Sequence, residues 1–237
     1  GIPLYYGILF RSTDIHMKQP EIRRRLIWSK TLRWCHWGMT LSVLVLLFSG
    51  WLITWIPEKA DNLDDAHYVG AAVLIAVLTI RLWLLLLGKS NDLLKNLLPN
   101  RHQLRQGWQV LRSYLSLGKI PLPKWYAHNP LWAPLYLLLF AILLLQIFSG
   151  LLLLNQITLL GELSIRQMHI LGFQVISLFT LLHILASFFH DAKDTGSDIS
   201  AMVNGHRIFI IESQQPETPQ SSTVISLDSL KKTINKP

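Results

Sequence analysis

Residues 167–190, QMHILGFQVISLFTLLHILASFFH, contain no Asp, Glu, Lys or Arg and carry three histidines among apolar side chains. A helix that crosses the hydrocarbon core of a bilayer needs roughly 20 mostly apolar residues. Three further stretches meet this requirement, residues 34–57, 66–88 and 131–154, and Arg81 is the one charged side chain within them. The sequence therefore predicts an all-α fold, an integral membrane four-helix bundle.

The overall composition points to the same class of protein. Of the 237 residues, 51% are hydrophobic and 15% are charged, whereas a soluble domain has about 25% charged residues. This balance excludes a soluble globular domain and a disordered chain. The single cysteine, Cys35, excludes a secreted disulfide scaffold.

The basic residues indicate how the chain is oriented in the membrane. Residues 1–33 hold seven Lys and Arg, residues 89–128 hold seven, and five follow from residue 191 onward, which makes 19 of the 22. Basic residues collect on the cytoplasmic side of membrane proteins. We therefore expect a multi-pass protein of the bacterial inner membrane with both termini cytoplasmic. The net charge of +8 then predicts contact with lipid headgroups rather than with nucleic acid.

We expect three parts along the chain: a cytoplasmic segment at residues 1–30, a membrane domain at residues 31–210, and a disordered cytoplasmic tail at residues 211–237, rich in Gln, Ser, Thr and Pro. In residues 89–128, leucines at helical spacing among basic residues predict an amphipathic helix at the membrane interface. We also expect Met17 to be the native start of the chain, with residues 1–16 lying upstream of it.

Five histidines lie within the predicted spans or at their edges: His36, His67, His169, His183 and His190. Ionisable side chains in a span are costly and are usually functional. His169 and His183 are 14 residues apart, so they occupy one face of the same helix at a separation of about 21 Å.

The depth of each histidine suggests how they pair. Measured from the midpoints of the spans, His67 lies about 15 Å and His169 about 14 Å toward the outer face, so these two match. His36 lies about 14 Å toward the inner face, His183 about 7 Å and His190 about 17 Å. Geometry alone leaves both His183 and His190 open as the partner of His36.

Two histidine pairs near opposite faces favour haem over other ligands. Two imidazoles fill both axial positions of a haem iron and suit it to electron transfer. Zinc prefers a tight tetrahedral cluster, and a small transporter would place its polar site at the midplane. A haem-free anchor would not explain the matched depths. Arg81 could either extend to the inner interface or neutralise a haem propionate.

Two short motifs recur along the chain. Phe48-Ser49-Gly50 returns as Phe148-Ser149-Gly150, and His67-x-x-Gly70 returns as His169-x-x-Gly172. Small residues allow helices to pack closely, or leave room for a flat group between them.

With these motifs the chain resembles the di-haem cytochrome b subunits of bacterial nickel–iron hydrogenases and formate dehydrogenases, in the cytochrome b561-like group. The resemblance covers roughly residues 20–210 and follows the four spans in order. It rests on Arg33-Trp-Cys-His36-Trp37 with Phe48-Ser-Gly50, His67-Tyr-Val-Gly70 with Arg81, His128-Asn-Pro130 with Tyr136 and Ser149-Gly150, and Arg166-x-x-His169 with His183 and Ser200-Ala-Met202-x-x-Gly205.

The resemblance implies two b haems, held by His67 with His169 near the periplasm and by His36 with His183 near the cytoplasm. It thereby selects His183 over His190. It further implies electron transfer between an iron–sulfur partner subunit and the quinone pool, without bond chemistry apart from quinone exchange near the inner haem. A periplasmic nickel–iron hydrogenase is the expected partner, because the third span resembles that type more closely. The long cytoplasmic loop and tail also leave room for an iron–sulfur partner in the cytoplasm. A formate dehydrogenase, a thiosulfate or sulfur reductase, and a stand-alone cytochrome b561 are the alternatives.

Overall fold

The computed structural model describes residues 21–56, 58, 60–88, 90–193 and 198–211. The expected start at Met17 and residues 212–237 of the expected disordered tail lie outside these residues. Residues 24–208 form one compact unit, which contains all four long helices.

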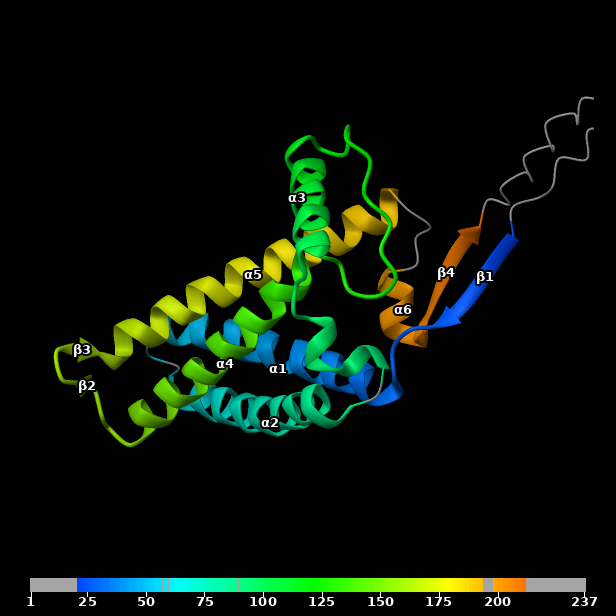
Figure 1. Cartoon of the computed structure of the whole chain (residues 1–237). Helices are drawn as coiled ribbons and strands as arrows, with labels where there is room; N and C mark the ends of the chain where they lie inside the picture. Colours follow the sequence, from blue (N-terminus) through cyan, green and yellow to red (C-terminus); the bar gives the residue numbers. More distant parts are fainter. Residues whose placement is uncertain (1–20, 57, 59, 89, 194–197, 212–237) are drawn as a thin grey trace, which may run out of the picture. The chain divides into compact units, whose positions relative to one another are not determined.

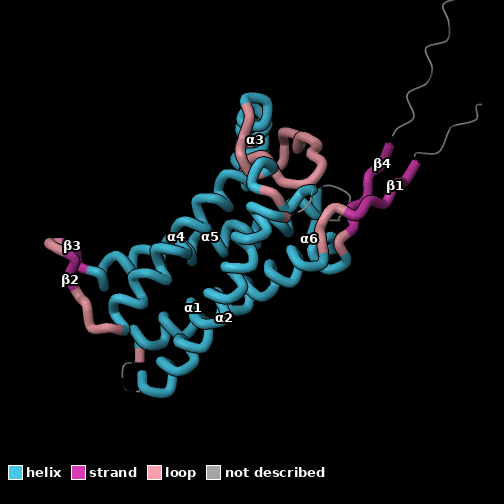
Figure 2. Tube along the Cα trace, turned by 60° about the horizontal axis from the view of Figure 1, so that its bottom comes forward, coloured by secondary structure: helices cyan, strands magenta, loops and turns pink. Residues whose placement is uncertain are grey.

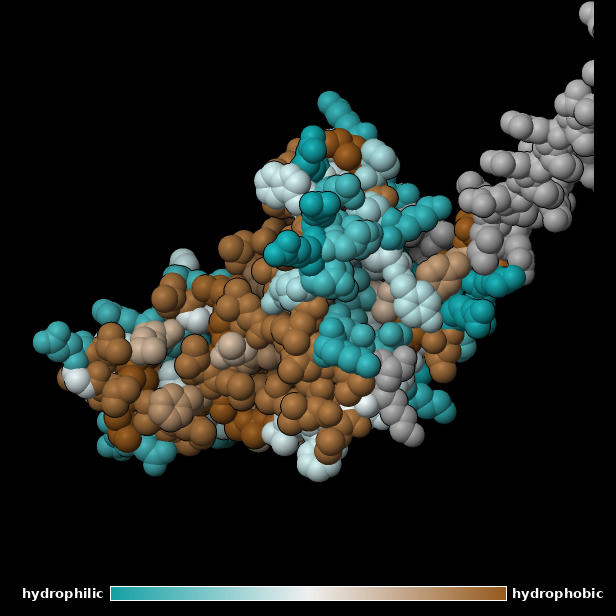
Figure 3. Space-filling model, in the orientation of Figure 1, coloured by the Kyte–Doolittle hydropathy of each residue, from teal (hydrophilic) through white to brown (hydrophobic). Residues whose placement is uncertain are grey.

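The four predicted spans are present as helices α1 (Lys30–Trp55), α2 (Ala60–Leu87), α4 (Trp132–Leu154) and α5 (Ile165–Lys193) (Figure 1). Each is long and apolar enough to cross a membrane. Large apolar side chains such as Leu41, Val69, Leu145 and Leu178 are exposed along them, and hydrophobic residues cover most of the visible surface of the spans (Figure 3). A helix satisfies its own backbone groups, which lipid cannot do. The prediction of a membrane four-helix bundle is therefore confirmed.

The spans pack as two helical hairpins, α1 with α2 and α4 with α5. The second hairpin is closed by a short β-ribbon of β2 (Leu159–Leu160) and β3 (Leu163–Ser164), in which Leu160 pairs with Leu163. Gly161 opens the two-residue turn with a φ of +61°, a backbone conformation that glycine adopts without strain. This end of the bundle carries the loop that contains no basic residue.

At the opposite end the chain forms the predicted amphipathic helix, α3 (Arg101–Leu115), preceded by the 3-10 turns η2 (Ser90–Asp92) and η3 (Leu94–Asn96). A capping box between Asn100 and Gln103 starts α3. Its inner face, which includes Val110 and Ser113, is buried, whereas Leu104, Trp108 and Leu115 are exposed. In both views α3 runs across the direction of the spans, as an interfacial helix would (Figure 2).

The end of α5 is continued by a short helix, α6 (Asp198–Asn204), which packs on the start of α1. The Asp191 carboxylate accepts a hydrogen bond from the backbone N–H of Asp198 at 2.8 Å and so caps α6. Trp37 Nε1 donates to the carbonyl of Met202 at 3.0 Å, which ties α6 to α1. Strands β1 (Glu21–Leu26) and β4 (His206–Ile211) pair with each other.

Candidate functional site

His36 of α1 lies opposite His183 of α5 at the end of the bundle that carries α3; we name this the inner end and the opposite one the outer end. Their ring centroids are 6.3 Å apart and both side chains are half-buried. His36 Nδ1 is buried and has no hydrogen-bond partner among the described residues. An unsatisfied buried nitrogen is costly, so this ring is suited to bind a ligand.

At the outer end, His67 of α2 lies opposite His169 of α5, with ring centroids 6.5 Å apart. His67 Nδ1 is 2.8 Å from Ser49 Oγ, and His169 Nδ1 is 2.8 Å from Ser149 Oγ. Both serines belong to the repeated Phe-Ser-Gly motif, for which the sequence left packing and room for a flat group as alternatives.

The spacing of both pairs suits one metal ion between two imidazoles. Metal–nitrogen bonds of roughly 2 Å on opposite sides of an ion place two ring centroids roughly 6 Å apart. Among the described residues there is no group of three or more His, Cys, Asp or Glu that could hold a metal. This disfavours a tetrahedral zinc site, which needs such a group. Each pair instead fits a metal ion whose remaining donor atoms come from a bound ligand and not from the protein.

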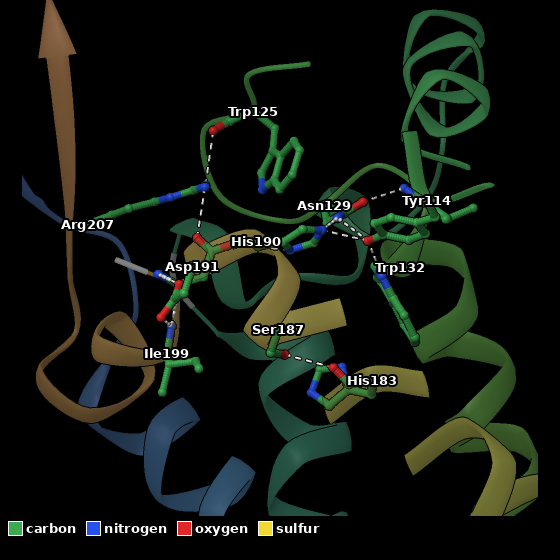
Figure 4. Close-up of polar contacts among 12 residues, drawn as sticks. Tyr114, Trp125, Asn129, Trp132, His183, Ser187, His190, Asp191, Ile199 and Arg207 are labelled. Carbon is green, nitrogen blue, oxygen red and sulfur yellow. Dashed lines mark hydrogen bonds and ion pairs between the residues drawn. The ribbon is translucent and has the colours of Figure 1, made fainter. Parts of the chain in front are cut away.

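His190 has a different environment from His183, although depth alone left both open. Its Nε2 is 2.6 Å from Tyr114 Oη and 3.4 Å from Asn129 Nδ2, and its Nδ1 is 3.4 Å from an Asp198 carboxylate oxygen. Figure 4 shows His190 in this polar cluster, apart from the His183 ring. Both nitrogens of His190 are thus engaged, and the residue is only 5% exposed.

The inner pair opens into a cavity of about 400 Å³, a size typical of sites for small ligands and cofactors. The cavity lies between the two hairpins, because residues of all four spans line it. Aromatic rings surround His183 within it: Phe179 stacks at 6.0 Å, and Trp132 and Tyr136 stand edge-on at 5.4 and 5.9 Å. Such walls suit a flat, apolar group.

Two buried arginines line the same cavity, Arg81 and Arg207, each 5% exposed. Arg207 forms an ion pair with Asp198 at 2.8 Å. Arg81 donates to the backbone carbonyl of Asp92 at 3.2 Å and lies over the Phe140 ring, and among the described residues no Asp or Glu forms an ion pair with it. The charge of the buried Asp92 acts on Arg81 without a direct ion pair. A buried cation is most stable in a direct ion pair, so this end of the cavity is suited to a ligand that carries carboxylates.

His128, from the His128-Asn-Pro130 motif of the resemblance, also lines the cavity. Its ring stands edge-on to Trp28 at a centroid distance of 4.8 Å. Burial, and to a smaller extent the positive charge of Arg81, lowers the pKa of His128 to about 4. The ring is therefore neutral near pH 7.

Sequence reasoning missed most of the polar cluster around His190. Tyr114 comes from α3, Asn129 from the loop before α4, and Asp198 and Arg207 from the region after α5. No motif links these positions, because they meet only in the folded chain. For Ser49 and Ser149 a signal existed, since the Phe-Ser-Gly motif occurs twice.

A bundle of apolar spans with paired imidazoles across its interior is the architecture of a transmembrane b-type cytochrome. Comparison with protein families agrees. The model of the family described as prokaryotic cytochrome b561 matches residues 27–205, and the chain belongs to this family.

Two relatives of this chain are similar along most of their length. One, described as a probable Ni/Fe-hydrogenase B-type cytochrome subunit, is from Azotobacter chroococcum mcd 1; it is 26% identical over 85% of this chain and 97% of the relative. A protein of the same description from Cupriavidus necator is 24% identical over 80% of this chain and 89% of the relative. No solved structure matches the chain.

Membership in a b-type cytochrome family implies haem b, and the residues present fit this group. The facing imidazoles provide nitrogen ligands from two sides, and the unsatisfied His36 Nδ1 shows that this ring lacks a competing partner at that atom. The aromatic cavity suits the macrocycle, and Arg81 suits its carboxylates.

Proposed function

We propose that this chain is the membrane cytochrome b subunit of a Ni/Fe hydrogenase, and that it binds two b haems and passes electrons between an iron–sulfur subunit of the hydrogenase and quinone. The observation that carries the proposal is the presence of two facing histidine pairs, at 6.3 and 6.5 Å, toward opposite ends of the bundle. The descriptions of both relatives support a hydrogenase as the partner.

In this proposal His67 and His169 hold the outer haem, and His36 and His183 hold the inner haem. Haem iron bound by two imidazoles takes up and releases single electrons and has no open position for oxygen chemistry. The histidines come from α1, α2 and α5, while α4 contributes Trp132, Tyr136 and Phe140 to the inner cavity. These large side chains keep water away from the inner histidines.

Arg81 has the role of a counter-ion in this proposal. It is buried in α2 and faces the inner cavity; the charge of the buried Asp92 acts on it, but among the described residues it has no acidic partner in a direct ion pair. The carboxylates of a haem at His36 and His183 would supply that partner. Of the two roles that the sequence left open for Arg81, its burial supports this one over extension to the interface.

The orientation follows from the distribution of charge. Basic residues of α3 and its flanking loops lie at the end of the bundle that contains His36 and His183, and the β2–β3 loop at the other end has none. We therefore place the inner pair near the cytoplasm and both termini in the cytoplasm. The outer pair then lies near the periplasm, and we propose that the hydrogenase docks on that side of the inner membrane. Quinone would exchange near the inner pair.

The proposal is tested by haem content per polypeptide, measured as the pyridine haemochrome of the purified protein. We expect two haems in the wild type, one in His183→Ala, and two in His190→Ala, because His190 makes structural contacts with Tyr114 and Asp198. Loss of a haem in His190→Ala with both retained in His183→Ala would overturn the ligand assignment. Absence of haem from the wild type, expressed with sufficient haem, would overturn the function.

A further inference from the structure

The two helical hairpins repeat the same local structure around the outer histidines. Ser49 and Ser149 are 100 residues apart, and His67 and His169 are 102 residues apart. In each hairpin the serine of the first helix contacts Nδ1 of the histidine on the second helix at 2.8 Å. The outer pair is thus built from two copies of one serine–histidine unit.

The glycines next to Ser49 and Ser149 show that the two hairpins match in more than the serine–histidine hydrogen bond. A side chain at Gly50 would meet His67 Cε1 at 3.5 Å, and one at Gly150 would meet His169 Cε1 at 3.3 Å. Both glycines thus place the helix backbone directly beside the imidazole that the adjacent serine contacts, more tightly at Gly150 than at Gly50.

The contacts one turn away repeat as well. Gly70, three residues after His67, packs against Leu46, and Gly172, three residues after His169, packs against Gln146. Leu46 and Gln146 are again 100 residues apart. Gln146 adds a hydrogen bond from its Nε2 to the carbonyl of His169 at 2.8 Å, which further fixes that turn of α5.

The direction of the serine hydrogen bonds determines which imidazole nitrogen is left over. Ser49 Oγ donates its proton to the carbonyl of Val45 at 2.7 Å, and Ser149 Oγ donates to the carbonyl of Gln146 at 3.0 Å. A hydroxyl has one proton to donate. Each serine oxygen therefore accepts the Nδ1–H of its histidine, and Nε2 is the nitrogen that remains for a metal.

We propose that Ser49 and Ser149 are positioning residues of the outer histidine pair, and that by accepting both Nδ1–H groups they give the outer haem a lower midpoint potential than the inner haem. The inference rests on the proposed function, since it requires two haems. A hydrogen bond from Nδ1–H makes an imidazole more basic and fixes its orientation. A more basic ligand stabilises the oxidised iron and lowers the potential.

The inner site lacks these units. His36 Nδ1 has no hydrogen-bond partner among the described residues. The positions that correspond in the repeat to His36 and His183 are Tyr136 and Arg81, and both line the inner cavity. The positive charge of Arg81 favours the reduced, more negative form of a group bound there. Both differences place the higher potential at the inner site, so electrons move downhill from the outer pair to the inner pair.

The test is a redox titration of purified Ser49→Ala and Ser149→Ala, followed by optical and EPR spectroscopy. We expect each variant to raise the lower of the two midpoint potentials, to leave the higher one unchanged, and to alter the EPR signal of the same haem. Ser42→Ala is the matched control, because Ser42 is buried in α1 and donates to the Gly38 carbonyl of its own helix. We expect this control to change neither potential.

Threonine at the same positions keeps the hydroxyl, so Ser49→Thr and Ser149→Thr should restore the wild-type potentials. Haem affinity can fall by about 10–100-fold when such a hydrogen bond is lost. Loss of one haem from the alanine variants with both kept in the threonine variants would therefore support the same role. Unchanged potentials with two haems bound, a shift of the higher potential, or an equal shift in Ser42→Ala would overturn the inference. A wild type without two haems would instead overturn the proposed function.

Discussion

His36 of α1 and His183 of α5 lie with their ring centroids 6.3 Å apart, although 147 residues separate them along the chain. They come from the first and the last span of the bundle. The alternative partner, His190, is engaged by Tyr114 and Asp198.

Because the two rings share one site in our proposal, His36→Ala and His183→Ala should remove the same haem. We expect each single variant and the double variant to retain one haem per chain with identical absorption bands. Pyridine haemochrome content and low-temperature spectra measure this. If the double variant lost both haems while each single variant lost one, the two histidines would belong to different sites.

Replacement of Arg81 by Gln should lower the midpoint potential of the inner haem, because it removes a buried positive charge from the cavity wall. A unit charge about 10 Å away, at an effective dielectric of about 20, changes the free energy of adding one electron by roughly 1–2 kcal/mol, which corresponds to tens of millivolts in midpoint potential. Arg81→Lys, which keeps the charge, is the control. An equal shift in both variants would show that the charge of Arg81 is not the cause.

Tyr114→Phe should destabilise the inner end of the bundle. The hydroxyl donates to His190 Nε2 at 2.6 Å and accepts from Trp132 Nε1 at 2.9 Å. Burial raises the pKa of Tyr114 to about 12, so the hydroxyl remains a donor at neutral pH. We expect a loss of about 1–3 kcal/mol, measured by unfolding in detergent. Tyr68→Phe, at an exposed position on α2, should have little effect.

His128 should make the protein less stable in acid. Its pKa is about 4 in the folded chain against 6.5 for an ordinary histidine, so between these values the unfolded chain binds more protons. The contribution of the neutral ring is complete above pH 6.5 and is lost as the pH falls toward 4. His128→Gln should therefore weaken the pH dependence of stability in this window by roughly 1–3 kcal/mol. A wild-type slope in this variant would contradict the prediction.

The proposed orientation predicts which loops a membrane-impermeant thiol reagent reaches in intact cells. Glu162→Cys, in the β2–β3 turn, should react from outside, whereas Lys119→Cys, after α3, should react only after lysis. Both positions are exposed, and the native Cys35 is buried and gives a low background. The reverse labelling pattern would place the termini in the periplasm.

The sequence was sufficient to predict the class of fold. Four long apolar stretches, interrupted only by Arg81, predicted the spans, because a bilayer requires length and hydrophobicity whatever the packing. Helix ends were less predictable: α2 begins at Ala60, six residues before the apolar stretch that starts at residue 66, so Asp64 and Asp65 lie within the helix. A search for apolar stretches misses such polar turns at the start of a helix.

The sequence by itself determined four membrane spans, the periodicity that puts His169 and His183 on one face of a helix, and the repeated Phe-Ser-Gly motif. These depend on local spacing and on hydrophobicity, which can be read along one segment. The tertiary structure places His183 and not His190 opposite His36, a choice that spacing left open and that only the family resemblance implied. Tertiary structure alone decided that each serine contacts an outer histidine and that Tyr114 and Asp198 contact His190. Such contacts depend on how helices that are distant in sequence pack side by side. The spacing of two residues along the chain does not show whether this packing brings them together.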